Sequence, residues 1–329
     1  MRFIGIDLAW SLRNTRRPDT GGVVLDDGGR VIAHANLTTD DAIVDFVLEH
    51  TDTDGGIVGI DAPLVVRNAT GFRKCETALQ AIGIRAFPAN RTRFFREDTY
   101  SGIRGEDIVE RLNEHGFTLR AEIAQGQMQR SIIEVYPHAL IKRTWGTIAP
   151  YKTGKSSVGA DLSFGLMELQ RLMLEHIDPL LYWERPPIDP GIVATLGPTA
   201  LRRHGDLLDA ALCAYLGYLS WYGGPERVEA VGNIADGFIM LPRLSDVTKA
   251  KTLTVRIGNR KIADALQTLA VEQSRSVDDI VNEALRNWLD HQEEVEDLAA
   301  IAEVEGETTI PWEQVQAEMR ASRTEGNSA

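Results

Sequence analysis

Two apolar segments with the character of β-strands each end in an acidic residue, and this pattern constrains the fold more than any other feature of the sequence. The segment FIGIDLAW, residues 3–10, places Asp7 after small and apolar side chains, and GGIVGIDAPL, residues 55–64, places Asp61 in the same way. An ionised carboxylate in apolar surroundings costs several kcal/mol unless it is paired or binds a cation. These strands therefore require a basic partner or a metal ion beside them.

The elements around these two strands predict an α/β fold with a mixed sheet. β-type runs flank the turn at Asp27-Gly28-Gly29, so the first three strands are expected to form an antiparallel meander. Residues 38–50 then place apolar side chains at helical spacing behind a Thr/Asp cap, and the strand that ends in Asp61 follows. Three strands, a helix and a fourth strand, with acids on the first and fourth strands, is the order of ribonuclease H. The sequence therefore predicts an RNase H-like mixed sheet flanked by helices.

Three further acids lie on later elements. Glu134 belongs to a strand predicted at 131–137. Asp206 and Asp209 lie three positions apart on one face of a long apolar helix predicted over 199–222. We favour Asp209 as a ligand because two alanines follow it and indicate close packing there, and we keep Asp206 as a second candidate.

These acids are of the residue type that Mg²⁺ or Mn²⁺ prefers. Hydrolysis of phosphodiester bonds by two ions about 3.5–4 Å apart needs three or four carboxylates at one place. A single acid at a strand end is commonly satisfied by its own loop, but several acids in this order favour a shared metal site. The predicted metal ligands are Asp7, Asp61, Glu134, Asp206 and Asp209, and all of these except Asp206 are also predicted to be catalytic.

Several short motifs between residues 1 and about 240 resemble the family known as domain of unknown function 429. They are GIDLAW, GIDAPL, RKCE followed by GIRAFP, EVYPHA and DLLDA. Members of that family are predicted to be RNase H-like nucleases, so the resemblance implies metal-ligand roles for the acids Asp7, Asp61 and Asp209, with Glu134 beside them. It also implies that Arg73, Glu76 and His138 lie on the substrate side of the site.

Residues 73–96 combine arginines with phenylalanines, which is a pattern that binds nucleic acid by holding phosphates and stacking on bases. A solvated loop whose aromatic side chains pack inward explains the same pattern equally well. The residues concerned are Arg73, Arg85, Arg91, Arg93, Arg96, Phe87, Phe94 and Phe95. The segment YKTGKSS offers further candidates to neutralise a substrate phosphate, namely Tyr151, Lys152 and Lys155, although a lysine-bearing loop is the commoner explanation.

Residues 252–292 resemble the ribbon-helix-helix family and follow a predicted linker at 246–251. The segment TLTVRI alternates apolar with polar side chains and precedes two helical stretches. Such domains form dimers that pair this strand and lay it in the DNA major groove. The resemblance implies a homodimer through residues 252–292, base contacts by Thr252, Thr254 and Arg256, and a phosphate contact near Ser276. A dimerisation module that reads no DNA is the alternative.

The last segment, residues 293–329, is acidic and is expected to be disordered. The stretch IPWEQVQAEM within it is similar to the toxin-wrapping segments of antitoxins built on the ribbon-helix-helix fold. That similarity implies a toxin-like protein partner with Trp312 as the anchor. A solvated tail without a partner is the simpler view.

Composition excludes some classes of protein. The net charge of −13 lacks the basic excess usual for tight non-specific binding of nucleic acid, so nucleic acid would be met by local patches or through metal ions. No membrane span or signal peptide is expected, and two cysteines without a disulfide framework suit the cytoplasm.

The sequence favours a metal-dependent nuclease targeted by a ribbon-helix-helix domain. The alternative is a DNA-binding transcriptional regulator or antitoxin-like protein whose RNase H-like domain is not catalytic.

Overall fold

The computed structural model describes most of the first 243 residues and part of the region after them. The described residues are 1–9, 20–51, 55–95, 102–152, 162–175, 177, 179–184, 186, 188–243, 260–272, 277, 280, 281 and 284. The chain divides into two units, Met1–Ala250 and Lys251–Ala329.

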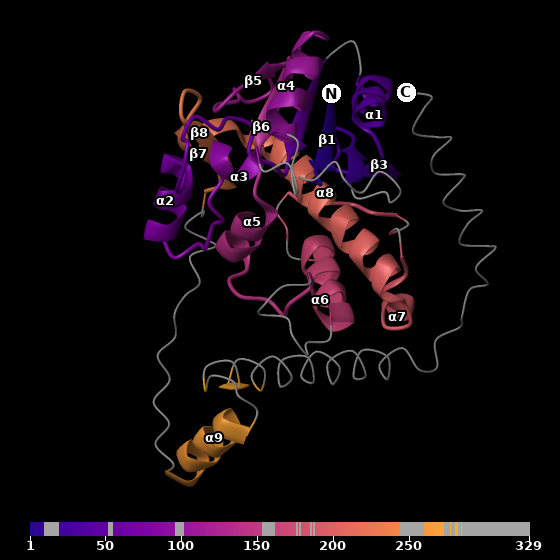
Figure 1. Cartoon of the computed structure of the whole chain (residues 1–329). Coiled ribbons are helices and arrows are strands. Elements are labelled where there is room, and N and C mark those ends of the chain that lie inside the picture. Colours follow the sequence, from indigo (N-terminus) through magenta and orange to yellow (C-terminus); the bar gives the residue numbers. More distant parts are fainter. Residues whose placement is uncertain are drawn as a thin grey trace, which may run out of the picture. The chain divides into compact units, whose positions relative to one another are not determined.

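A six-stranded mixed sheet forms the centre of the first unit (Figure 1). Its strand order is β3-β2-β1-β4-β6-β5, in which β1, β2 and β3 pair antiparallel and β1, β4, β6 and β5 run parallel. The strands are β1 Arg2–Asp7, β2 Thr20–Leu25, β3 Val31–Leu37, β4 Gly56–Ile60, β5 Thr118–Leu119 and β6 Arg130–Glu134. The predicted meander of the first three strands is confirmed.

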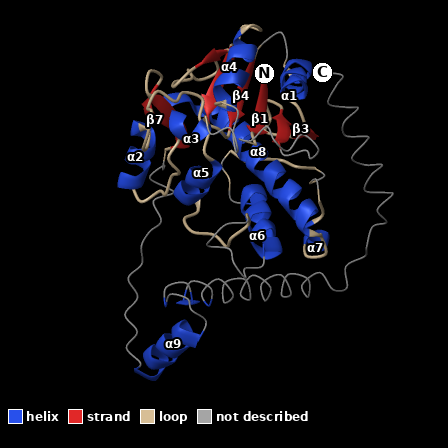
Figure 2. Ribbon diagram, in the orientation of Figure 1, coloured by secondary structure: helices blue, strands red, loops and turns tan. Residues whose placement is uncertain are grey.

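Helices cover both faces of this sheet (Figure 2). The long helix α8 packs on β1, β2 and β4, while α1 and α4 contact each other and lie on the opposite face. Alternate strand residues feed the two cores: Phe3 and Ile57 pack toward α8, and Ile4 and Val58 toward α1 and α4. The helices of this unit are α1 Asp40–His50, α2 Lys74–Ala81, α3 Arg91–Phe94, α4 Arg104–Asn113, α5 Pro137–Thr144, α6 Leu162–Glu175, α7 Pro190–Val193 and α8 Pro198–Gly223.

The predicted helices α1 and α8 begin and end as their sequences dictate. The α1 helix starts after Thr39, whose hydroxyl oxygen accepts a hydrogen bond from the Ala42 N–H. Helix α8 has Pro198 in its first turn and ends at Gly224, whose φ of 58° is favourable for glycine. Residues 204–220 of α8 are all buried, because the sheet, α5, α6 and a second hairpin surround the helix.

The second hairpin was not predicted from the sequence. Strands β7, Val228–Asn233, and β8, Gly237–Pro242, pair antiparallel, and a bridge joins Met240 of β8 to Val135 just after β6. The hairpin therefore extends the first unit beyond α8 and lies next to the end of the sheet that carries the acids.

The described part of the second unit contains the helix α9, Arg260–Glu272. The linker at 246–251, the DNA-contacting residues Thr252, Thr254, Arg256 and Ser276, and the tail at 293–329 lie outside the described residues. Their predicted roles stay predictions. None of the helices that the structure describes has both the length and the apolar character required to cross a membrane.

Candidate functional site

Asp7 and Asp61 lie side by side because β1 and β4 run parallel and in register. Ile6 pairs with Ile60, and the backbone N–H of Asp61 donates a hydrogen bond to the Ile6 carbonyl oxygen at 2.8 Å. The carboxyl ends of neighbouring parallel strands meet at one edge of a sheet, where α/β proteins commonly bind ligands. Both acids were predicted to meet there, and the structure brings them together.

A glycine two positions before each acid lets helix α8 approach the sheet. In both Gly-Ile-Asp segments the glycine and the aspartate share the face that α8 covers. A Cβ atom on Gly5 would lie 1.8 Å from the carbonyl oxygen of Ala210. A Cβ atom on Gly59 would lie 2.3 Å from the carbonyl oxygen of Cys213. Only glycine permits this contact, and the contact brings Asp209 of α8 over the strand ends.

Asp7, Asp61 and Asp209 form an acidic triad in which one carboxylate oxygen of each residue lies within 4.8 Å of the others. Asp7 is 8% exposed and Asp209 is 2% exposed. The Lys152 Nζ atom lies 2.9 Å from a carboxylate oxygen of Asp7 and 2.5 Å from one of Asp209. Three carboxylates and one ammonium group leave an excess of negative charge at this place.

The surroundings of the triad make ionisation unfavourable for Asp61 and Asp209. Burial, together with the carboxylates of Asp7 and Asp209, raises the pKa of Asp61 well above its usual value. Burial raises the pKa of Asp209 to about 6, although the charge of Lys152 opposes the shift. Burial acts to lower the pKa of Lys152, yet the carboxylates of Asp209 and Asp7 hold it well above its ordinary value. The triad therefore favours a bound cation.

Asp206 lies beside the triad but is not part of it. Its carboxylate oxygen is 3.7 Å from Lys152 Nζ, and burial and the Asp7 carboxylate raise its pKa to about 7. Tyr151, which precedes Lys152, donates a hydrogen bond from its hydroxyl group to Asp209 at 3.1 Å. The segment before α6 thus contributes both an ammonium and a hydroxyl group to the carboxylates of α8.

Glu134 lies apart from the triad because of its register in β6. Ile60 pairs with Glu134, so Val135 is the β6 residue level with Asp61, and its N–H donates to the Ile60 carbonyl oxygen at 2.9 Å. Since neighbouring residues of a strand point to opposite faces, the Glu134 side chain points away from α8. Burial raises the pKa of Glu134, while Arg73 opposes this shift. We therefore do not include Glu134 among the metal ligands proposed below.

Arg73 and Glu134 form a buried ion pair that holds the loop after Asp61. Arg73 Nη2 lies 2.6 Å from Glu134, and its Nη1 also donates to the Val65 carbonyl oxygen at 3.2 Å. The second oxygen of Glu134 accepts a hydrogen bond from the Leu64 N–H at 2.9 Å. Glu76 completes the network, since it accepts bonds from the Arg73 backbone N–H and Nε. The substrate-binding roles predicted for Arg73 and Glu76 stay predictions, and the structure shows both side chains engaged within the protein.

The basic segment at 73–96 divides into buried, paired and pocket-lining side chains. Phe94 is buried, and Arg91 pairs with Glu106 at 3.0 Å. Phe87 and Arg93 line a pocket at the edge of the sheet that carries the acids. His138, which was predicted to contact substrate, is exposed and does not line this pocket.

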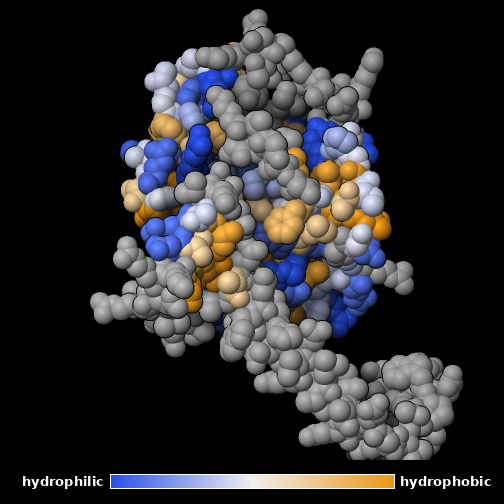
Figure 3. Space-filling model, turned by 90° about the horizontal axis from the view of Figure 1, so that it is seen from below, coloured by the Kyte–Doolittle hydropathy of each residue, from blue (hydrophilic) through white to orange (hydrophobic). Residues whose placement is uncertain are grey.

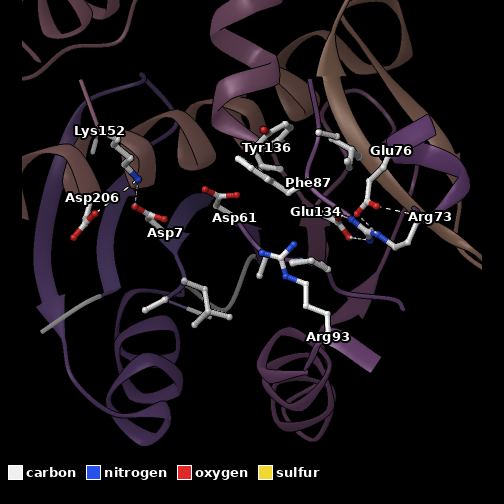
Figure 4. A pocket seen from close by; sticks show the side chains of 17 residues that line it. Asp7, Asp61, Arg73, Glu76, Phe87, Arg93, Glu134, Tyr136, Lys152 and Asp206 are labelled. Atoms are coloured by element: carbon white, nitrogen blue, oxygen red, sulfur yellow. Dashed lines mark hydrogen bonds and ion pairs between the residues drawn. The ribbon is translucent and has the colours of Figure 1, made fainter. Parts of the chain in front are cut away.

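The pocket has a volume of about 450 Å³ and contains acidic, basic and apolar walls (Figure 4). Asp7, Asp61, Asp206 and Lys152 line one side of it, and Arg73, Glu76 and Glu134 line another. Phe87 and Tyr136 lie between these two groups in Figure 4. Most of the predicted metal-ligand and substrate-side residues thus line one pocket, in two separate charged clusters, whereas Asp209 and His138 do not line it.

Tyr136 is a site residue that reasoning from the sequence did not identify, and Tyr151, predicted as a phosphate-binding candidate, contacts Asp209. Tyr136 lines the pocket, and burial and the charge of Asp61 raise its pKa. Tyr136 belongs to the segment SIIEVYP and lies two residues after the end of β6, at the edge of the sheet where the acids lie. Its position at a strand end was the available signal. The contact of Tyr151 with Asp209 carried no such signal, because it depends on how two distant segments pack. Lys155, which was predicted with it, lies outside the described residues.

The donor set of the triad fits a divalent metal ion. Carboxylate oxygens are the ligands that Mg²⁺ and Mn²⁺ prefer, and the triad already holds a cationic group in Lys152. The structure therefore shows that Asp7, Asp61 and Asp209 could hold a metal ion, as the sequence predicted for these three residues.

Comparison with known proteins gave one match. A model of the family described as Protein of unknown function (DUF429) matches residues 5–230. No curated protein and no solved structure matches the chain.

Proposed function

The chain belongs to the DUF429 family, and from this premise we propose that it is a nuclease that hydrolyses phosphodiester bonds of nucleic acid with the help of Mg²⁺ or Mn²⁺. The observation that carries the proposal is the convergence of Asp7, Asp61 and Asp209 at the carboxyl ends of two parallel strands. Carboxylates arranged in this way are typical of sites that hold ions for transfer at phosphorus.

The topology of the sheet supports an RNase H-like assignment within this proposal. The first three strands form a meander, and the next strand in the chain joins β1 in parallel after the helix α1. Acids on the first and fourth strands, with a third acid on a helix packed across them, are what the RNase H ordering predicts. Because one fold serves many functions, the proposal depends on the triad rather than on the sheet alone.

Each residue of the site has a part in the proposed reaction. Asp7, Asp61 and Asp209 would hold the metal, while Lys152, whose side chain is 40% exposed, would bind a phosphate oxygen of the substrate. Asp206 holds Lys152 from the other side. When bound, the metal supplies Lewis-acid stabilisation of the phosphate and lowers the pKa of a water molecule. The Arg73–Glu134 pair keeps the loop after Asp61 in place.

The second unit would deliver this activity to DNA. We propose that residues 252–292 form a homodimeric ribbon-helix-helix domain and that the acidic tail binds a toxin-like protein. These parts of the proposal depend on the resemblance of the sequence alone.

The substitution Asp7→Asn tests the nuclease. It removes one negative charge from the triad with little change in volume, so we expect it to abolish cleavage and weaken Mg²⁺ binding while the fold persists. The assay is cleavage of labelled single-stranded, duplex, hybrid and branched substrates in Mg²⁺ or Mn²⁺. Asp27→Asn, in an exposed turn, is the matched control and should cleave as the unchanged protein does.

Cleavage that survives Asp7→Asn would remove Asp7 from the site. If no substrate is cleaved by the unchanged protein while DNA is still shifted in a gel, the nuclease proposal is overturned. That outcome would favour the DNA-binding regulator or antitoxin-like protein.

A further inference from the structure

Exposed apolar side chains do not by themselves mark a binding site on this protein. On the face shown in Figure 3, small hydrophobic patches lie among hydrophilic residues. Much of the surface of any folded protein is apolar, so such patches need no ligand to explain them. A pocket lined by both aromatic and cationic groups is more informative, and the pocket beside the triad is of this kind.

An aromatic and apolar wall continues from the acids into this pocket. Phe87 is 54% exposed, which is unusual for a large apolar side chain that lines a cavity. Tyr136 lies next to it in Figure 4, and Ala86 and Ile239 also line the pocket. Tyr136 donates its hydroxyl hydrogen bond to the Arg85 carbonyl oxygen at 3.1 Å, which fixes its ring. The Tyr136 part of the wall is therefore held in place without a ligand.

A cationic group is present at the same pocket. Arg93 lines it, and Figure 4 shows the guanidinium group pointing toward Asp61. Its Nη1 donates a long hydrogen bond of 3.4 Å to the Pro88 carbonyl oxygen, and among the described residues no carboxylate pairs with it. Its neighbour Arg91 is instead paired with Glu106. Arg93 is thus available to bind an anionic group of a ligand.

We infer that this pocket holds one unpaired nucleotide of a nucleic-acid strand, with its base against Phe87 and its phosphate near Arg93. The inference rests on the proposed function and names its substrate class, a strand with at least one unpaired nucleotide. A cavity of about 450 Å³ is of the size that accepts a small organic group. Bases of an intact duplex are not accessible to such a pocket unless they leave the stack.

Binding of a labelled oligonucleotide by the full-length protein tests the inference directly. Fluorescence anisotropy measures the affinity of the protein for a short single strand and for the same strand in a blunt duplex. Both measurements are made in a buffer that contains Ca²⁺. We expect Phe87→Ala to weaken single-strand binding about tenfold, since stacking on an aromatic ring is lost. Duplex binding is expected to stay unchanged. Phe87→Trp should restore single-strand binding because it keeps an aromatic face.

Phe95→Ala is the matched control for this experiment. Phe95 belongs to the same segment and is 57% exposed, but it does not line the pocket. Its loss should leave single-strand binding unchanged. Arg93→Gln should weaken single-strand binding and reduce its dependence on salt, because one phosphate contact is removed.

The outcomes separate this inference from the nuclease proposal. Single-strand binding that depends on Phe87, without cleavage by the unchanged protein, would support the nucleotide pocket and overturn the nuclease. Cleavage with equal single-strand affinity in Phe87→Ala and Phe95→Ala would overturn the pocket and leave the nuclease standing. Equal affinity of the unchanged protein for a free nucleoside monophosphate and for the strand would also overturn the assignment to a strand.

Discussion

The Lys152 ammonium group occupies a position that matters for metal binding. It lies within 2.9 Å of Asp7 and 2.5 Å of Asp209, so its positive charge neutralises part of the triad. A divalent ion that binds the same carboxylates has to compete with this charge. At the scale of single residues, Lys152 and a metal ion compete for the same carboxylates. Burial strengthens the electrostatic interaction between each pair of charges.

Removing the Lys152 charge should strengthen metal binding. We expect Lys152→Gln to bind Mg²⁺ or Mn²⁺ about tenfold more tightly, because a competing charge and its repulsion of the ion are lost. Calorimetric titration measures the affinity. Lys74→Gln, which breaks an exposed pair with Asp236, is the control and should leave the affinity unchanged. Weaker metal binding in Lys152→Gln would show that the lysine does not compete for the triad.

Asp206 should lower the stability of the metal-free protein at neutral pH. Burial raises its pKa in the folded state to about 7 from an ordinary value of 3.8. At pH values between these two pKa values, the folded state therefore binds more protons than the unfolded state does. This contribution to stability is present at low pH and is lost as the pH rises through 7. We expect Asp206→Asn to raise the free energy of unfolding at pH 8 by about 1–3 kcal/mol.

Urea denaturation at pH 5 and pH 8 in the presence of a chelator checks this prediction. The advantage of Asp206→Asn should be larger at pH 8 than at pH 5. Asp27→Asn, at an exposed turn, should show no such difference. If the gain in the free energy of unfolding of Asp206→Asn does not change with pH, the raised pKa of Asp206 is not its cause.

At the scale of elements, the site depends on the contact between α8 and the sheet. The two Gly-Ile-Asp segments place a glycine under the helix and an aspartate beyond it, so packing and ligand position are set by the same three residues. The helix then supplies Asp209 from a stretch that is buried on all sides. Close packing and an acidic site are therefore inseparable in this fold.

A methyl group at Gly5 should disrupt this contact. Its Cβ would lie 1.8 Å from the Ala210 carbonyl oxygen and 2.4 Å from the Ala214 nitrogen, both of which are backbone atoms that cannot turn away. We expect Gly5→Ala to destabilise the protein by about 3 kcal/mol or more and to weaken metal binding. Thermal unfolding and metal titration measure the two effects. Gly28→Ala, in a turn where the nearest atom is 3.4 Å away, should be tolerated, and equal behaviour of the two variants would contradict the packing argument.

At the scale of the whole molecule, the acidic site belongs to the first unit alone. The triad, the residues that line the pocket and the described core clusters all fall within Met1–Ala250. The residues predicted to contact DNA fall within Lys251–Ala329. The proposed hydrolysis and the proposed DNA targeting thus fall in different units of the chain.

Truncation after Ala250 should separate the two activities. We expect the shortened chain to keep its metal affinity and its cleavage of short substrates, because the triad is complete without the second unit. Affinity for duplex DNA should fall and the protein should become monomeric. Calorimetry, gel shift and light scattering measure these properties. Loss of metal binding on truncation would show that the first unit needs the second to form its site.

Patterns that act between near neighbours allowed much of this structure to be predicted. The meander, the cap of α1 at Thr39 and the long helix α8 follow from turn residues, capping groups and apolar spacing. The acids Asp7 and Asp61 were placed together because equivalent ends of parallel strands share an edge. The β7–β8 hairpin was missed because it lies in a short segment after α8, where no turn signal was recognised.

The sequence by itself determined much of the secondary structure, including the first three strands, α1 and α8, and which acids stand on these elements, since backbone propensity and side-chain period act over a few residues. Only the tertiary structure decided which of the later acids join Asp7 and Asp61. A register one residue different would have turned Glu134 toward α8, but β6 places Val135 level with Asp61 and leaves Glu134 to Arg73. The contact of Tyr151 with Asp209 was decided in the same way. Register and helix docking are set by contacts between residues far apart in the chain, and a local pattern carries no information about them.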